Sequence, residues 1–181
     1  VREAFRTALS PRQGPVALNL PRDLLAQVIE PATAMLPAVA GAAAAVARPA
    51  GDLAAIDAAA QMLLAARRPL VLAGGGVKNG RSARETVALA EALGAPVVMS
   101  PGHGDAIGCS HPLYGGQVGP RGNAVASALA READVILALG TRLGFNTTFY
   151  TYDNLNPEAR IIQVELEPTA IGRFFPVALG I

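Results

Sequence analysis

The sequence predicts an α/β fold, with a doubly wound parallel sheet of about six strands in a Rossmann-like domain. After residue 51, short uninterrupted apolar runs alternate with segments whose apolar residues recur every three or four positions. Uninterrupted apolar runs are typical of parallel strands that helices cover on both faces. The composition agrees, because 51% of the residues are hydrophobic and only 4% are aromatic. We therefore expect a core built from alanine, valine, leucine and isoleucine.

The helices and strands of this domain are expected in alternation along residues 52–181. Asp52 is placed to cap a first helix that directs Leu53, Ile56, Ala60, Leu63 and Leu64 to the core. Strands are expected at 69–73, 95–99, 135–139, 161–165 and 177–181, and helices at 81–93, at 123–131 with Asn123 as its cap, and from Pro168. The segments 100–122 and 140–157 are expected to be loops. In the second of them Tyr150, Tyr152 and Asp153 are expected at the surface or at an interface.

The first 51 residues have a different character. Residues 1–30 predict the end of an amphipathic helix, a short edge strand over 16–20 between prolines, and a helical turn opened by Asp23. Residues 31–51 consist largely of alanine, proline and glycine with almost no charge, which predicts a semi-rigid linker. Three segments are therefore expected: the end of another domain (1–30), a linker (31–51) and the α/β domain (52–181). Both chain ends interrupt predicted elements, so we expect an excised piece of a larger protein.

Charge and cysteine content narrow the classes of function. The net charge is +1 with both signs interspersed, so no nucleic-acid-binding surface is expected, and no apolar run is long enough for a membrane span. The single cysteine, Cys109, excludes an internal disulfide and suits a reducing, cytoplasmic compartment. Two histidines and one cysteine cannot supply a structural zinc site. We expect neither a metal site nor a catalytic constellation of paired carboxylates or an activated nucleophile.

The candidate ligand site lies where the predicted strands end, because doubly wound sheets bind ligands beyond the carboxyl ends of their strands. The turn Gly74–Gly76 could present backbone N–H groups to a phosphate, and Arg142 could pair with a pyrophosphate. An acidic residue at or just after the end of the strand predicted over 161–165 could accept a hydrogen bond from a ribose hydroxyl. Two interpretations stay open: a dinucleotide or ADP-like ligand, or glycines that serve only the bend and an arginine paired with a loop carboxylate. A Walker loop is excluded, since its lysine and hydroxyl residue do not follow the glycines, and a conventional nicotinamide dehydrogenase is disfavoured, since no acidic residue ends the next strand.

Three segments resemble one family. Residues 14–23 (GPVALNLPRD) are similar to the segment that closes the pyrimidine-binding domain of thiamine-diphosphate-dependent enzymes. Residues 67–76 (RRPLVLAGGG) resemble the start of their central domain, and its later strands resemble residues 133–142 (ADVILALGTR) and 161–165 (IIQVE). The motifs occur in the family's order over nearly the whole chain, and acetolactate synthase is the most similar member by pattern. Sulfoacetaldehyde acetyltransferase and oxalyl-CoA decarboxylase are neighbours.

The resemblance implies a three-domain parent enzyme that decarboxylates a 2-oxo acid and transfers the resulting acyl-anion equivalent. Its catalytic glutamate, which tautomerises the aminopyrimidine of thiamine diphosphate, would lie upstream of Val1, and the motif that holds Mg²⁺ and the cofactor diphosphate would lie downstream of Ile181. This chain alone is therefore expected to be inactive. The implied partners are the pyrimidine- and diphosphate-binding domains and further copies of the enzyme. No nucleic acid or membrane partner is expected.

The resemblance also implies a ligand for this domain, because acetolactate synthases hold FAD here and oxalyl-CoA decarboxylase holds ADP. Gly144 is a departure, since FAD-holding acetolactate synthases usually carry an acidic residue at that position. The alternatives are a stand-alone nucleotide- or flavin-binding module and a ligand-free structural domain. The residues carried over as nucleotide-binding are Gly74, Gly75, Gly76, Met99, His103, Thr141, Arg142, Glu165 and Glu167.

Overall fold

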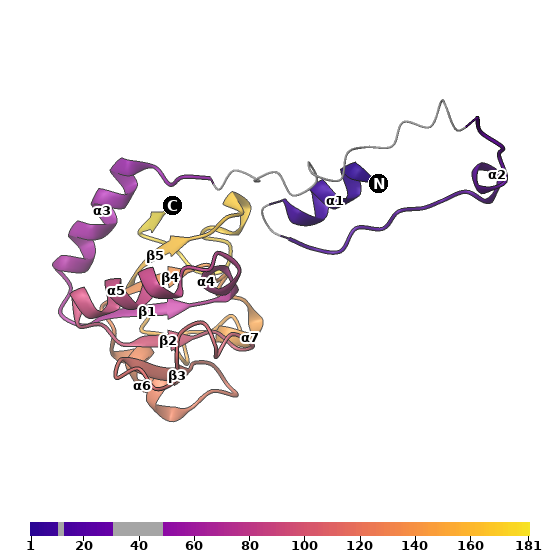
Figure 1. Cartoon of the computed structure of the whole chain (residues 1–181). Coiled ribbons are helices and arrows are strands. Elements are labelled where there is room, and N and C mark those ends of the chain that lie inside the picture. The colour runs from indigo at the N-terminus through magenta and orange to yellow at the C-terminus, as the bar shows by residue number, and fades with distance from the viewer. Residues whose placement is uncertain (11–12, 31–48) are drawn as a thin grey trace. The chain divides into compact units, whose positions relative to one another are not determined.

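The computed structural model describes residues 1–10, 13–30 and 49–181 (Figure 1). Its chain divides into two compact units, Val1–Ala50 and Gly51–Ile181. Most of the predicted linker, residues 31–48, lies outside the described residues.

The described residues of the first unit contain two short helices. Helix α1 (Arg2–Leu9) has an exposed ion pair between Arg6 and Glu3 at 3.1 Å, and α2 (Arg22–Leu25) follows Pro21. The strand predicted over 16–20 is wrong, because that segment has no secondary structure and Val16, Leu18 and Leu20 are exposed. An extended segment becomes a strand only by pairing, and among the described residues no strand pairs with it.

The second unit is built on a six-stranded parallel sheet in the order β3-β2-β1-β4-β5-β6. Figure 1 shows β5, β4, β1, β2 and β3 stacked from top to bottom. This is the strand order of a doubly wound Rossmann sheet, so the predicted fold class is confirmed. The strands are β1 (Pro69–Ala73), β2 (Val97–Met99), β3 (Tyr114–Gln117), β4 (Val135–Leu139), β5 (Arg160–Val164) and β6 (Leu179–Gly180).

Helices cover both faces of this sheet. They are α3 (Leu53–Leu64), α4 (Gly75–Asn79), α5 (Ala83–Leu93), α6 (Ala124–Glu132), α7 (Phe145–Thr148) and the 3₁₀ helix η3 (Pro168–Ala170). Alternate residues of β1 enter different cores: Val71 packs with residues of α3, α4 and α5, whereas Leu70 and Leu72 pack with residues of α6. That alternation follows from the two-residue period of a strand and gives the sheet a buried layer on each side.

Most predicted elements are confirmed where the signal was local. Strands β1 and β4 have the predicted bounds, and both predicted caps form: Asp52 accepts from the Ala55 N–H at 3.3 Å and Asn123 from the Ala126 N–H at 2.6 Å. Two predicted loops were wrong in part. Strand β3 lies within 100–122 and the short helix α7 within 140–157.

The predicted core face of α3 is largely wrong. Leu63 is buried as predicted, but the second buried residue is Ala59, while Leu53, Ile56, Ala60 and Leu64 are exposed. Only Asp57 and Gln61 interrupt the apolar sequence of this helix, so apolar spacing alone cannot distinguish one side of it from another. Among the described residues, no helix is long and apolar enough to cross a membrane.

Asp134 links two neighbouring strands at the amino edge of the sheet. Its carboxylate accepts hydrogen bonds from the N–H groups of Arg67 at 2.7 Å and Arg68 at 2.9 Å, and so ties the residues before β1 to the start of β4. Burial acts to raise the pKa of Asp134, but these N–H groups outweigh it and the pKa lies below its usual value. The folded protein therefore favours the charged carboxylate.

Replacing Asp134 with alanine should lower the free energy of unfolding at pH 7 by about 2 kcal/mol, because two hydrogen bonds to a charged acceptor are lost. Since folding lowers this pKa, the stabilisation is complete well above pH 3.8, the ordinary value, and disappears as the pH falls through the folded-state pKa. Urea unfolding of the protein and the variant at pH 7 and pH 3 measures both effects. Asp57→Ala, at an exposed aspartate of α3, is the control; an Asp134 effect equally large at pH 3 would contradict the assignment.

Candidate functional site

The candidate site lies beyond the carboxyl ends of β1 and β4. The strand order reverses between these two neighbours, and in doubly wound sheets ligands bind at that reversal. Three segments meet there or close by: the glycine turn 74–76 after β1, the loop that begins at Ser100 after β2, and the turn 140–144 after β4. These are the segments on which the sequence placed most of the candidate residues.

The glycine turn packs backbone to backbone against the turn after β4. The Gly74 N–H donates to the Leu139 carbonyl at 2.9 Å, and the Gly76 N–H donates to the Gly140 carbonyl at 3.0 Å. A Cβ on Gly76 would lie 2.5 Å from the Gly140 Cα, and Gly140 has φ +56°. These glycines therefore permit a close approach, and two N–H groups of the turn already have partners within the fold.

The loop after β2 is fastened to α4. The imidazole of His103 lies over Gly75, where a Cβ would come 2.8 Å from the ring Cε1. Lys78 of α4 forms an exposed ion pair with Asp105 at 2.6 Å, and the hydrogen bond from Lys78 lowers the pKa of that carboxyl. Lys78 is thereby directed to a neighbouring loop. The His103 ring covers Gly75, the middle glycine of the turn.

Arg142 is an exposed cation at this edge. It follows buried Thr141 and precedes buried Leu143, so the turn is anchored on both sides of an exposed guanidinium. Within the described part of the chain, Arg142 makes no ion pair and no side-chain hydrogen bond. The expected alternative, a salt bridge to a loop carboxylate, is absent from those residues. A free guanidinium can pair with a phosphate through two parallel hydrogen bonds.

Gln163 positions the turn that carries Arg142. Its buried amide donates to the carbonyls of Thr141 at 3.1 Å and Ala170 at 3.3 Å, and its Oε1 accepts from the Gly172 N–H at 2.9 Å. Sequence reasoning missed this residue. The available signal was a single amide inside the otherwise apolar run of β5, because a buried polar side chain must find partners in the fold.

The remaining predicted residues serve the fold locally. Met99 is fully buried in the core, so its side chain does not reach the surface. Glu165 accepts from the Leu166 N–H at 3.0 Å, and Glu167 caps η3 and accepts from the Thr169 hydroxyl at 3.0 Å. The structure thus brings Gly74 and Gly76 against the turn of Thr141 and Arg142, and Gly75 against His103. Among the described residues, no three His, Cys, Asp or Glu side chains form a metal-binding cluster.

An aromatic surface lies on the segment after this turn. We define it as Phe145, Phe149, Tyr150 and Phe174, whose neighbouring ring centroids are 4.6 to 5.8 Å apart. All four rings are exposed, and the Arg173 guanidinium lies 5.3 Å from the Phe174 centroid. This agrees with the surface position expected for Tyr150.

The backbone around the aromatic surface is held in an unusual conformation. Leu143, Phe149 and Tyr150 have φ values of +51°, +54° and +59°, a region that side chains other than glycine rarely occupy. The buried hydroxyl of Thr148 stabilises it by donating to the Leu143 carbonyl at 3.1 Å and accepting from the Tyr150 N–H at 3.0 Å. The exposed rings are therefore fixed by the fold beneath them.

Comparison with known proteins gives consistent matches. The family model described as "Thiamine pyrophosphate enzyme, central domain" matches residues 56–181. The sulfoacetaldehyde acetyltransferase of Rhodobacter capsulatus is 42% identical over 172 residues, which are 92% of this chain and 28% of that protein. The probable acetolactate synthase large subunit of Methanocaldococcus jannaschii is 32% identical over 95% of this chain and 29% of its own length, and the acetolactate synthase of Mycobacterium bovis is 32% identical over 94% and 27%. The chain spans little more than a quarter of the length of these curated relatives.

Replacing Gly140 with alanine should lower the free energy of unfolding by more than about 2 kcal/mol, because an alanine there combines a left-handed backbone with a clash against the glycine turn. Gly144→Ala is the matched control four residues later, since nothing lies within 4 Å of its Cβ position. Chemical denaturation of both variants measures the difference. Equal stabilities would show that the turns do not pack as described.

Replacing Gln163 with alanine should lower the free energy of unfolding by about 2 kcal/mol, because it leaves the Thr141 carbonyl and the Gly172 N–H without this partner and removes one of the two donors to the Ala170 carbonyl. Gln61→Ala, at an exposed glutamine of α3, should be nearly neutral. Thermal unfolding followed by circular dichroism compares them. A Gln163 variant as stable as the control would refute the role of this amide.

Proposed function

The chain belongs to the thiamine pyrophosphate enzymes as their central domain, and from this premise we propose that it is the scaffold of an acyl-transferring enzyme. The observation that carries the proposal is the family match over 56–181, with relatives in two thiamine-dependent activities. The predicted resemblance is thereby confirmed. The parent would decarboxylate a 2-oxo acid, or cleave a related acyl donor, and transfer the acyl-anion equivalent to an acceptor.

The donor that the relatives favour is sulfoacetaldehyde. The sulfoacetaldehyde acetyltransferases are 38 to 42% identical to this chain, against 32% for the acetolactate synthases. The test is the longer polypeptide that contains this segment, incubated with thiamine diphosphate, Mg²⁺, an acyl acceptor and either sulfoacetaldehyde or a 2-oxo acid. Acetylation of the acceptor from sulfoacetaldehyde, with cleavage of the carbon–sulfur bond and release of sulfite, supports this donor. Release of CO₂ from the 2-oxo acid alone supports the acetolactate synthase-like alternative, and turnover of neither overturns the proposal.

Thiamine diphosphate and Mg²⁺ belong to the parent in this proposal, held by its pyrimidine- and diphosphate-binding domains. There the thiazolium supplies an electron sink, while the protein supplies position and electrostatics. The role that we propose for this chain is to hold those two domains at a fixed distance from each other. The aromatic surface supports that role, because exposed rings with an adjacent arginine are typical of surfaces that dock on other protein. A homo-oligomeric, cytoplasmic enzyme is the assembly we propose, and the free thiol of Cys109 suits a reducing compartment.

An adenine nucleotide, FAD or ADP, is the finer part of the proposal. The glycine turn fits a pyrophosphate poorly, because the N–H groups of Gly74 and Gly76 donate to carbonyls of the fold. The exposed and unpaired guanidinium of Arg142 is the described group at this edge that fits one. We therefore propose that a nucleotide is held by Arg142 and not by a glycine cradle. The alternative is a scaffold without a ligand, in which the glycines serve only the close packing of the two turns.

Titration with FAD or ADP should raise the thermal midpoint of the chain by several degrees at a ligand concentration of about 100 Kd. Arg142→Ala should abolish the rise, since the phosphate loses its cation. Arg160→Ala, at an exposed arginine that begins β5 on the opposite edge of the sheet, should leave it unchanged. Differential scanning fluorimetry measures all three proteins. A flat titration of the unaltered chain would assign the domain to the ligand-free alternative.

A further inference from the structure

We propose that helix α5 and the groove beside it form a self-complementary interface, on which a second copy of this chain docks with its own α5 antiparallel across a two-fold axis. This surface lies apart from Arg142 and from the aromatic surface. The inference is independent of which acyl donor or nucleotide the protein uses, because it rests on the pattern of charge and apolar surface along α5.

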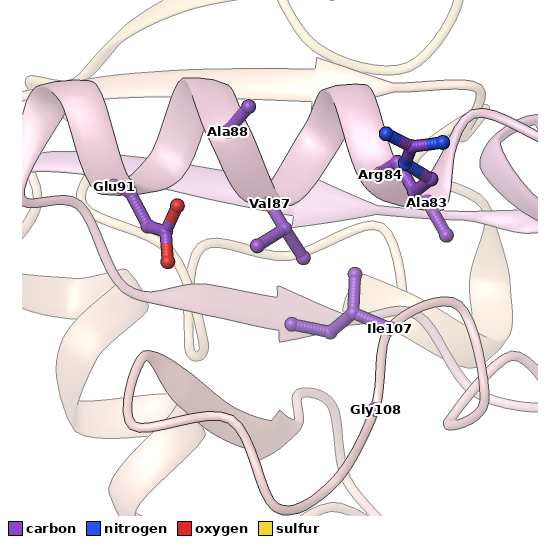
Figure 2. Close-up of a pocket in the computed structure, with 7 residues that line it drawn as sticks. All are labelled: Ala83, Arg84, Val87, Ala88, Glu91, Ile107 and Gly108. Carbon is purple, nitrogen blue, oxygen red and sulfur yellow. The ribbon is translucent and has the colours of Figure 1, made fainter.

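The groove runs along α5. Figure 2 shows it between that helix and the loop that carries Ile107 and Gly108, with Val87 and Ile107 pointing toward each other. Its lining is apolar in the middle and charged at both ends, with Arg84 at one end and Glu91 at the other. A second hollow with Cys109 continues it past Ala83 and Ile107. The seven lining residues are Ala83, Arg84, Val87, Ala88, Glu91, Ile107 and Gly108.

The two charges have the spacing that antiparallel pairing requires. Arg84 and Glu91 are seven residues apart, close to two turns, so they lie on one side of the helix about 10 Å apart along its axis. Val87 and Ala88 stand at the midpoint between them. A two-fold axis through that midpoint places Arg84 of one copy opposite Glu91 of the other, and the reverse pair follows by symmetry.

Both charges are available for such pairs. Among the described residues Arg84 makes no ion pair or side-chain hydrogen bond. Glu91 is exposed, and its Oε1 contacts His111 Nε2 at 3.2 Å. Because His111 Nδ1 accepts from the Leu113 N–H at 3.2 Å, the ring proton is on Nε2 and is donated to Glu91. His111 thus holds the carboxylate at the end of the groove and leaves its second oxygen for a partner.

A second copy of this chain is the partner that fits the pattern of charged and apolar residues along the groove. A cation and an anion placed symmetrically about an apolar midpoint are complementary to the same surface turned around, whereas an unrelated partner needs a matching pattern of its own. The small side chain of Ala88 at the midpoint lets two helices approach closely, and the apolar lining supplies the area removed from water. The charges set the register of the pair.

Charge exchange tests the pairing. Sedimentation equilibrium of the 181-residue chain should show a dimer, and either Arg84→Glu or Glu91→Arg should weaken dimerisation at least about tenfold, since each places two like-charge pairs in the interface. The double variant Arg84→Glu/Glu91→Arg should restore the dimer. An equimolar mixture of the two single variants should form a heterodimer in which all four charges are paired. Arg160→Glu and Glu158→Arg, at exposed charges on another part of the sheet, are the controls.

A cross-link tests the geometry even where a charge variant folds poorly. In a Cys109→Ser background, Ala88→Cys should give a disulfide-linked dimer under mild oxidation, because the axis brings the two copies of this position together. Ala124→Cys, at an exposed alanine of α6, should not. The proposal is overturned if the unaltered chain stays monomeric at high concentration, or if the double variant and the mixture fail to restore the dimer. A dimer that is lost with Phe149→Ser but survives both charge reversals would assign the contact to the aromatic surface instead.

Discussion

The contact between the backbones of Gly76 and Gly140 is the constraint on which the carboxyl edge of the sheet depends. The Gly76 N–H bonds to the Gly140 carbonyl, while the Gly140 N–H bonds to the Val164 carbonyl of β5. A single residue of the turn after β4 is therefore joined both to the turn after β1 and to the end of β5. Gln163 continues this connection to η3, so the turn that carries Arg142 is fixed from both sides. What a ligand or a partner meets at this edge is decided by that set of bonds.

Much of the fold could be predicted because its signals are local. An uninterrupted apolar run defines β1 and β4, and a side-chain oxygen at Asp52 or Asn123 defines a helix start, whatever the rest of the chain does. Strand β3 could not be predicted in this way, since Tyr114–Gln117 contains two glycines and is a strand only through its ladder with β2. The opposite error occurred at 16–20, where a strand-like sequence has no neighbour to pair with among the described residues.

The candidate site, like the fold, could be predicted where the signal is local and could not where it depends on contacts between distant segments. The topological rule for doubly wound sheets pointed to the carboxyl ends of the strands, and among these the turns after β1 and β4 meet. The rule could not show that the glycine N–H groups are satisfied by carbonyls some 65 residues away, because that depends on how closely two turns approach. The same holds for Gln163, whose three partners come from turns beyond the ends of β4 and β5. Residue type and spacing identify groups that can bind, whereas only the fold tells which of them are still free.

The hydrogen bonds of Asp134 stabilise the amino edge of the sheet independently of the turns at its carboxyl edge. They fix β1 to β4 at the amino edge and share no atom with the turns at the carboxyl edge. Sequence change among those turns, such as the gain or loss of a cation at position 142, can therefore proceed without loosening the alignment of the central strands. A domain built on this arrangement can therefore change the surface of its carboxyl edge while its central strands keep their register.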